Sequence, residues 1–248
     1  MITICFVYFR HLTLAHLEAA LYSLRRQDFA CVLRLVVVDN NTGDSLADIQ
    51  ATVDSFDFPI PVILYSNKHG DPTKTHAWST NVTMRQAFTE WVFFCRADYL
   101  LSFNAIQKFW EITKDHSTDW DGFVTSKGSY LGTLADCKLS WREEGPETLT
   151  GLTYDHTVID AGVWLARRSS FERVGGLNEN LTAWGHAQTH FQWKLYGTGT
   201  QFHRIDDVLF HHMDHGGEKD IHLANSQLAQ QGLDLKEMWS RYDGPRVY

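Results

Sequence analysis

The chain has 248 residues, 44% of them hydrophobic and 21% charged, a composition typical of a globular protein and not of a disordered one. Its 22 basic and 30 acidic residues give a net charge of -8. That balance argues against nucleic acid as a partner, because such binding depends on Lys and Arg that neutralise phosphates. No stretch has the composition of a linker, so we expect a single domain over residues 1–248.

The cysteines and the N-terminal residues indicate in which cellular compartment the protein is expected. Four cysteines are widely separated and form no CxxC pair, and Cys5 and Cys95 lie in apolar runs, so we expect free thiols. The first residues, MITICFVYFRH, lack a basic leader and a cleavage site of small residues. No uncharged apolar stretch is long enough to span a bilayer. These features predict a cytoplasmic protein without a transmembrane segment.

The first hundred residues alternate between buried strands and amphipathic helices. Apolar, β-branched and aromatic runs predict strands at Ile2–Tyr8, Leu33–Val38, Pro61–Tyr65 and Trp91–Cys95. Three- and four-residue spacing of apolar side chains predicts helices between them, with inward positions Leu14, Leu17, Leu21 and Leu24, then Leu46, Ile49 and Val53, then Trp78, Val82 and Phe88. Such alternation predicts parallel strands in an α/β fold, with helices on both faces of the sheet.

Two aspartates lie at the carboxyl ends of predicted strands. Asp39 comes after LRLVVV, and Asp98 comes after WVFFC with two residues between. In open parallel sheets, ligands bind in the crevice beyond the carboxyl ends of the strands, which is where these carboxylates should lie. Each also has an ordinary structural interpretation. Asp39 opens a run rich in turn formers, and Asp98 could cap a helix that starts near Ser102 or end the strand in a turn.

The second half of the chain is less regular. We expect a helix over Ser102–Asp115 with Ile106, Phe109, Trp110 and Thr113 inward, and a long irregular segment over Ser126–Leu152. Further elements should follow as a strand at Ala161–Ala166, a short helix at Ser169–Val174 closed by two glycines, a helix at Trp184–Tyr196, a strand at Val208–His212 and a C-terminal helix at Ile221–Trp239.

Five segments together resemble a known family. They are ITICFVYFRHLTLAHLEAALYSLRRQ, VVVDNNTGD, SNKHG, FFCRADYLL and ARRSSFERVGGLNENLTAWGHAQTHF. Their order and spacing resemble those of family-2-like glycosyltransferases with the GT-A (Rossmann-like) fold, which has a mostly parallel central sheet with helices on both faces. The resemblance covers nearly the whole chain. It implies a nucleotide-binding half over 1–100 and an acceptor-side half over 101–248.

The resemblance implies how a nucleotide-sugar donor would be held. Asp39 corresponds to the family's aspartate that contacts the nucleobase, and Asn67 to an asparagine after the third strand. The same resemblance assigns donor binding to Tyr8, Arg10, Lys74, Arg96 and Asp98. A solvated lysine is an equally ordinary interpretation of Lys74.

A divalent metal, Mn²⁺ or Mg²⁺, is implied by the resemblance of RAD to the family's Asp-x-Asp motif. Asp98 matches the second aspartate, whereas Arg96 replaces the first. Arg96 could pair bidentately with phosphate and lessen the need for a metal. The family also places a metal-binding histidine after its last strand. Neighbouring side chains on a strand point to opposite faces, so only one of His211 and His212 can reach the site, and we assign His212.

The segment WGHAQTHF departs most from the family. Trp184 and Gly185 match its acceptor-side motif and would face the sugar or acceptor, while the expected catalytic acids are replaced by Ala187-Gln188 and by His190. Glutamine cannot act as a base at neutral pH. The base could be His190, His186 or Asp160. Alternatively, an amide such as that of Gln188 could assist a reaction that retains the anomeric configuration.

The sequence therefore predicts transfer of a sugar from a UDP-, GDP- or dTDP-sugar to a hydroxyl acceptor, which could be a saccharide, a protein or a lipid-linked molecule. Two alternatives stay open. The missing acids would suit a non-catalytic nucleotide-sugar-binding protein. A small basic groove would suit a glycosyltransferase that acts on modified DNA bases, despite the acidic net charge.

Overall fold

The computed structural model describes residues 1–9, 11–40, 43–67, 76–117, 119–133, 162–181, 186–214, 226–227 and 229–232. Most of the expected C-terminal helix at Ile221–Trp239 lies outside these ranges. An eight-stranded sheet in the order β3-β2-β1-β4-β7-β6-β8-β5 organises the chain. Its strands are β1 Ile2–Phe9, β2 Val32–Asn40, β3 Val62–Ser66, β4 Trp91–Arg96, β5 Tyr99–Leu101, β6 Gly122–Thr133, β7 Val163–Arg167 and β8 Gln201–Asp214.

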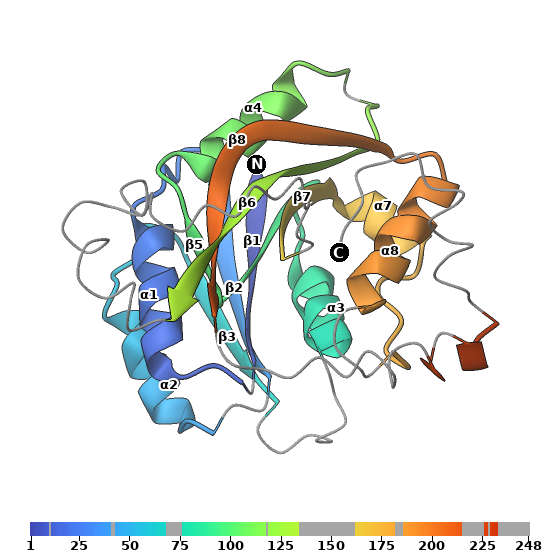
Figure 1. Ribbon diagram of the computed structural model, residues 1–248. Helices are drawn as coiled ribbons and strands as arrows, with labels where there is room; N and C mark the ends of the chain where they lie inside the picture. Colours follow the sequence, from blue (N-terminus) through green and yellow to red (C-terminus); the bar gives the residue numbers. More distant parts are fainter. Residues whose placement is uncertain are drawn as a thin grey trace.

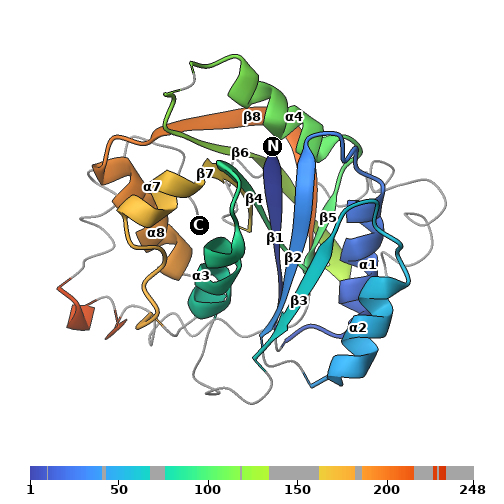
Figure 2. The same cartoon turned by 180° about the vertical axis from the view of Figure 1, so that it is seen from behind.

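Helices cover both faces of the sheet, as predicted. They are α1 Leu14–Arg25, α2 Leu46–Asp54, α3 His76–Gln86, α4 Ala105–Lys114, α7 Arg168–Arg173 and α8 His186–Gly197. The two opposite views agree that α1 and α2 lie on one side of the sheet, with α3, α7 and α8 on the other (Figures 1 and 2). Because β4 is followed at once by β5 at the far end of the strand order, the sheet curls.

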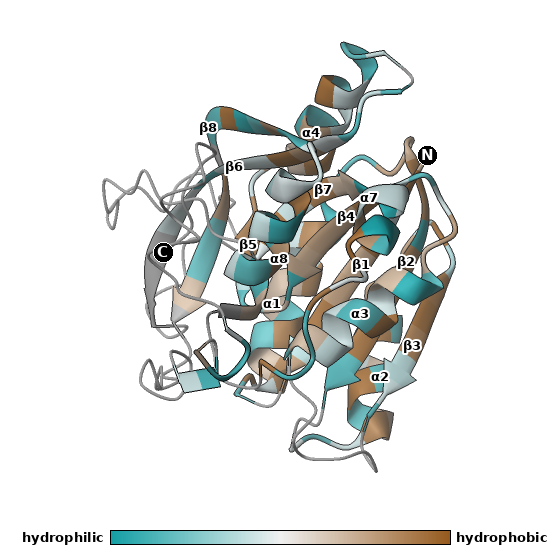
Figure 3. Ribbon diagram, turned by 90° about the vertical axis from the view of Figure 1, so that its right-hand side faces the viewer, coloured by the Kyte–Doolittle hydropathy of each residue, from teal (hydrophilic) through white to brown (hydrophobic). Residues whose placement is uncertain are grey.

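The strands at the centre of the sheet are the most apolar part of the chain. All eight residues of β1 and all six of β4 are buried, and their ribbons are coloured as hydrophobic over most of their length (Figure 3). β1 pairs in parallel with both β2 and β4, and β2 with β3. Long apolar strands are expected where both faces of a parallel sheet are covered. Cys5 and Cys95 are buried, and Cys31 is also free.

The second half of the sheet differs from the prediction in two places. The segment expected to be irregular from Ser126 contains most of β6 up to Thr133, while the remainder of that segment lies outside the described residues. The last strand is much longer than Val208–His212, because β8 starts at Gln201 and pairs along β6. Antiparallel pairs β4–β7, β6–β7 and β5–β8 make this half mixed.

The helices near the site end where local signals place them, with one exception. α7 closes as predicted, since Gly175 and Gly176 follow it at φ +72° and +71° and their N–H groups bond back to Glu172 and Phe171. The exception is α3, which ends at Gln86, so Phe88 lies beyond the helix with 46% of its surface exposed. The Arg34 guanidinium lies 4.2 Å from the centre of the Phe88 ring and covers it in part.

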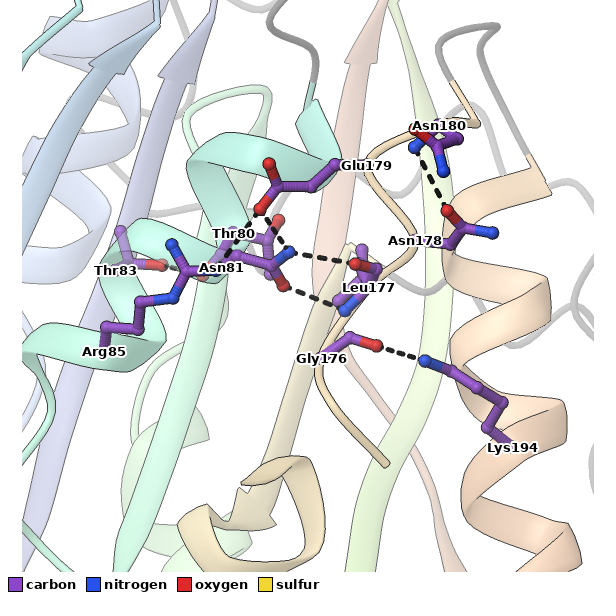
Figure 4. Close-up of polar contacts among 10 residues, drawn as sticks. All are labelled: Thr80, Asn81, Thr83, Arg85, Gly176, Leu177, Asn178, Glu179, Asn180 and Lys194. Atoms are coloured by element: carbon purple, nitrogen blue, oxygen red, sulfur yellow. Dashed lines mark hydrogen bonds and ion pairs between the residues drawn. The ribbon is translucent and has the colours of Figure 1, made fainter. Parts of the chain in front are cut away.

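A polar clamp joins α3 to the segment after α7 (Figure 4). The Asn81 side chain donates to the Leu177 carbonyl at 2.9 Å and accepts from the Leu177 N–H at 2.8 Å. Its Nδ2 also donates to Glu179 at 2.8 Å, and Arg85 lies 3.4 Å from the same carboxylate. A buried amide with two bonds to one backbone position fixes α3 against the second half of the chain.

Candidate functional site

The two aspartates that follow the predicted strands lie on either side of β1, at the same edge of the sheet. In the parallel register, Asp39 pairs with Tyr8, and Arg96 pairs with Val7 one residue earlier. Two strand spacings separate β2 from β4, about 10 Å between their backbones. Asp39 and Asp98 are fully buried by protein, with 0% exposure. This edge therefore gathers two carboxylates that are costly to bury without partners.

Asp39 belongs to a small hydrogen-bonded group on β2 and β3. It lies within β2, which continues to Asn40, so the interpretation of Asp39 as a turn former is wrong. Ser66 donates its hydroxyl to Asp39 Oδ2 at 2.7 Å, and the Asn67 N–H donates to the Asp39 carbonyl at 2.9 Å. The Asn67 side chain donates to Asn40 Oδ1 at 3.2 Å. Asp39 and Asn67 are thus brought together, with Ser66 and Asn40 as partners that the sequence did not single out.

Tyr8 points to the same region from β1. Its hydroxyl donates to Asp44 Oδ2, just before α2. Burial first, then the bond to Asp44, raise the pKa of the Tyr8 phenol well above its usual range, so it stays protonated. Arg10 and Lys74, also predicted to bind the donor, lie outside the described residues.

Arg96 and Asp98 form a bidentate ion pair at the end of β4. Arg96 Nε donates to Asp98 Oδ1 at 3.0 Å, and Nη2 donates to Oδ2 at 2.6 Å. Their side chains are 7% and 0% exposed. Nη2 also donates to the Tyr99 hydroxyl at 3.1 Å. The interpretation of Asp98 as a helix cap is wrong, because the N-cap of α4 is Asn104, but Asp98 does lie in the turn that ends β4.

The two neighbouring histidines on β8 do point apart. His212 Nε2 lies 2.9 Å from Asp98 Oδ2, and its ring lies 4.8 Å from the Tyr99 ring, centre to centre. His211 instead contacts the hydroxyls of Ser102 and Ser129. The antiparallel pairing of Tyr99 with His212 explains this arrangement, because it carries β8 past the end of β4. Of the two histidines, His212 is the one that contacts Asp98.

The spacing of Asp98 and His212 can be compared with that of two ligands of a divalent cation. Asp98 Oδ2 and His212 Nε2 lie 2.9 Å apart. Adjacent ligands of an octahedral Mg²⁺, each about 2.1 Å from the ion, lie about 3.0 Å apart, so this pair has the spacing of two such ligands. Among the described residues, no group of three His, Cys, Asp or Glu side chains gathers around a possible ion. The set fits a cation that takes its other ligands from water and phosphate.

His76, at the start of α3, was not assigned to the site but lies close to it. Its ring is 6.5 Å from that of Phe9 and 6.4 Å from that of Phe94, centre to centre. Both ring nitrogens are buried without a hydrogen-bond partner in the part of the chain that is described. Burial first, then the Arg96 charge, lower the pKa of His76 to about 3. His76 is therefore a neutral polar group beside Arg96.

α8 carries a second set of polar side chains. Gln188, His190 and Gln192 are 6%, 7% and 2% exposed. Among the described residues, Gln188 Nε2, His190 Nδ1 and Gln192 Oε1 have no hydrogen-bond partner. Burial first, then the Lys194 charge, lower the pKa of His190 to about 4, so its ring is neutral at pH 7. Gln192, which was not predicted as a site residue, lies one helical turn beyond Gln188, a spacing that is visible in the sequence.

The remaining predicted acceptor-side residues cannot be placed. Trp184, Gly185 and Asp160 lie outside the described residues, as does the side chain of His186. Within the described residues, no helix combines the length and the apolar character needed to cross a membrane.

Comparisons with known proteins agree with this geometry. A model of the family described as "Glycosyl transferase family 2" matches residues 4–175. The matched segment contains both aspartates, Arg96 and most of the sheet, and it is more than half of the chain. The protein belongs to glycosyl transferase family 2. No curated protein matches it closely enough to be counted as a relative.

Solved structures with the same fold are glycosyltransferases of low sequence identity. TarS 1–349 of S. aureus, in complex with UDP-GlcNAc, superposes with a TM-score of 0.64 at 13% identity, covering 88% of this chain and 60% of that one. Full TarS gives 0.61 at 14%, with 86% and 36% covered. The Pyrobaculum calidifontis mannosyltransferase PcManGT, in complex with GDP-Man and Mn²⁺, gives 0.59 at 15%, with 99% and 65% covered. The chain thus spans only about a third of full TarS. The predicted GT-A fold is confirmed.

Proposed function

We propose that the protein transfers a sugar from a UDP-, GDP- or dTDP-sugar to a hydroxyl group of a saccharide, a protein or a lipid-linked acceptor. The observation that carries the proposal is the placement of two polar groups at one sheet edge, on either side of β1: Asp39 with Asn67, and Asp98 with Arg96 and His212. Membership of glycosyl transferase family 2 supports it. So do structural neighbours that hold UDP-GlcNAc and GDP-Man.

The nucleoside belongs on the Asp39 side of β1. A carboxylate there accepts the imide N–H of uracil or thymine, or the corresponding donor of guanine. Ser66 donates to one carboxylate oxygen and orients it, at 2.7 Å. Asn67 and Tyr8 line the same strand ends, and Arg10 and Lys74 would reach the diphosphate from the adjoining segments. The 1–100 half is then the nucleotide-binding half of a single domain, which we place in the cytoplasm.

The diphosphate belongs on the Asp98 side. Arg96 offers it a planar pair of donors, and the neutral His76 beside Arg96 can donate one more hydrogen bond. Asp98 and His212 would hold Mn²⁺ or Mg²⁺, since their spacing suits two adjacent ligands. Such a cation supplies positive charge that balances the leaving nucleoside diphosphate.

The sugar and acceptor belong beside α8, and Trp184 and Gly185, which precede it in the sequence, would face them. Gln188 Nε2 is a buried donor available to a sugar hydroxyl. We assign His190 as the group that takes the acceptor's proton, because its ring is neutral at pH 7 and Gln188 cannot be a base. The acceptor oxygen then forms a bond to the anomeric carbon as the carbon–oxygen bond to the diphosphate breaks. A single displacement of this kind inverts the anomeric configuration.

A second function, nucleotide-sugar binding without transfer, is favoured by two observations. Both oxygens of Asp98 already accept hydrogen bonds from Arg96. A pKa of about 4 also makes His190 a weak base, far from the neutral value that suits proton transfer best. A protein of this kind would recognise the donor and leave it intact.

One experiment separates the two functions. The protein is mixed with UDP-, GDP- and dTDP-sugars and Mn²⁺, with and without an acceptor library, and both thermal stabilisation and release of the nucleoside diphosphate are measured. Transfer predicts stabilisation and release that Asp98→Asn abolishes. The matched control is Asp207→Asn, an exposed aspartate on β8 whose side chain is 61% exposed. Stabilisation without release for every donor and acceptor would identify the binding protein, and no stabilisation would reject both functions.

A further inference from the structure

The ion pair of Arg96 and Asp98 bears on the order in which ligands bind. The guanidinium contacts both carboxylate oxygens, at 3.0 and 2.6 Å, and His212 Nε2 contacts the second one at 2.9 Å. The pair is buried, with side chains 7% and 0% exposed. A carboxylate held on both oxygens by a guanidinium has little left to offer a cation.

Building on the proposed function, we propose that Arg96 and a divalent cation compete for Asp98, and that the donor's diphosphate ends the competition by drawing Arg96 onto itself. The nucleotide thereby creates the cation site. Without it, Asp98 stays neutralised by Arg96. With it, Asp98 and His212 are released as ligands.

Electrostatics supports the exclusion. A divalent cation on Asp98 Oδ2 would enter beside the positive charge of Nη2, which lies 2.6 Å from the same oxygen. The cation and the guanidinium would then share one oxygen atom, and two positive charges so close together repel strongly where water is excluded. Arg96 also cannot simply withdraw, because a buried guanidinium without an anion costs several kcal/mol. Exchange therefore requires a second anion, and a diphosphate can accept the same two parallel N–H bonds.

The surroundings of Arg96 suit a change of partner. The guanidinium carbon lies 5.6 Å from the centre of the Phe9 ring and 5.0 Å from that of Tyr99. Tyr99 packs closely against Gly162, where an added Cβ atom would clash with its ring. These rings attract a guanidinium whichever anion it faces. They keep Arg96 in the crevice while its hydrogen bonds move from carboxylate to phosphate.

The competition makes nucleotide and cation binding mutually dependent, because thermodynamic linkage is reciprocal. Mn²⁺ affinity is measured by titration calorimetry and by the electron paramagnetic resonance of free Mn²⁺, alone and with saturating UDP, GDP or dTDP. For the natural protein we expect one of the nucleotides to tighten Mn²⁺ binding by about tenfold to a hundredfold. Mn²⁺ should tighten binding of that nucleotide by the same factor.

Arg96→Gln removes the competing charge. Without nucleotide, Mn²⁺ should then bind to the variant about tenfold more tightly than to the natural protein. The factor by which nucleotide tightens Mn²⁺ binding should fall towards one. Arg96→Lys keeps the charge but not the bidentate geometry, so it serves if Arg96→Gln does not fold, and it should retain weak binding of Mn²⁺ alone. The exposed Arg204→Gln is the matched control and should change nothing.

Two results would overturn the proposal. One is tight Mn²⁺ binding by the natural protein without nucleotide, equal to that of Arg96→Gln. The other is nucleotide binding of the same affinity in EDTA as in Mn²⁺, which would mean that Arg96 alone serves the diphosphate. Both results leave nucleotide binding intact, so they are distinct from failure of the proposed function, in which no nucleotide binds under either condition.

Discussion

The carboxylates at the strand ends and the polar side chains on the first turns of α8 differ in how their burial is compensated. At the strand ends, partners lie within the protein: Asp39 has Ser66, and Asp98 has Arg96 and His212. On α8, Gln188 Nε2, His190 Nδ1 and Gln192 Oε1 are buried, and the described residues offer them no partner. An unsatisfied buried polar atom costs about 1–3 kcal/mol, so the two regions differ in what a ligand would change.

That difference teaches how each region would respond to its ligand. At the strand ends a ligand must exchange one hydrogen bond for another, so specificity arises from which ligand can take a partner's place. On α8 a ligand gains hydrogen bonds to atoms that have none among the described residues. Under the proposed function, the donor site would therefore discriminate between ligands, whereas the polar side chains of α8 would gain hydrogen bonds from the sugar or acceptor.

The largest effect should come from breaking the strand-end ion pair. Asp98→Ala leaves Arg96 buried without its anion and should lower the free energy of unfolding by about 3–5 kcal/mol. Replacing both partners, in Arg96→Met with Asp98→Leu, should recover most of that loss, since the site then packs against the Phe9 and Tyr99 rings. Urea unfolding measures both variants. Equal losses in the single and double variants would mean that the buried, unpaired charge of Arg96 is not the cause of the lost stability.

The clamp between α3 and the segment after α7 should give the next largest effect. Asn81→Ala removes both partners of Leu177 and should cost about 1–3 kcal/mol by urea unfolding. Arg85→Ala is the matched control, because it loses only the ion pair to the same Glu179. In that pair the Arg85 side chain is 63% exposed and the Glu179 side chain 34% exposed. That loss should stay below about 1 kcal/mol. A larger cost for Arg85→Ala than for Asn81→Ala would contradict the clamp of Figure 4.

The pH dependence of stability should reveal the burial of the neutral His190. Its folded pKa of about 4 lies below the unfolded value of about 6.5. Between these values the unfolded chain binds the proton more readily, so stability falls as pH falls from about 6.5 to about 4. His190 alone should contribute up to about 2 kcal/mol of loss between pH 8 and pH 5. Urea unfolding at both pH values should show a smaller loss for His190→Asn, and a loss equal to that of the natural protein would contradict this role of His190.

Burial explains which parts of the fold the sequence predicts. The last six residues of β2 and all six of β4 are buried, so their apolar runs are visible in the sequence, and Asp39 and Asp98 follow from where those runs end. β6 was missed because its buried positions include the polar side chains of Thr125, Ser126 and Ser129, and the first half of β8 because most of its side chains are polar and half-buried or exposed. The end of α3 was placed too late because Phe88 is apolar but exposed. Polar residues interrupt the apolar run by which a buried strand is recognised, so the pattern of these two strands is weak.

The candidate site was predictable as residues but not as contacts. The spacing of RAD shows that Arg96 and Asp98 are close in the chain, yet only the backbone turn after β4 lets the guanidinium fold back onto the carboxylate. His212 was chosen over His211 by strand alternation, and its contact with Asp98 depends on the pairing of β8 with β5. The unpartnered state of Gln192 has no signal in the sequence, since it depends on what packs around α8.

The smallest effect tests whether α8 is built to receive a ligand. Gln192→Leu removes a buried oxygen that has no partner among the described residues, so the protein should be as stable as before or more stable by about 1 kcal/mol. If that oxygen binds a hydroxyl of the sugar or acceptor, transfer should nonetheless slow by about tenfold, the loss expected for one hydrogen bond. Exposed Gln50→Leu on α2 is the matched control and should leave transfer unchanged. Higher stability with undiminished transfer would make Gln192 a packing defect, and lower stability would mean that its oxygen has a partner in the free protein.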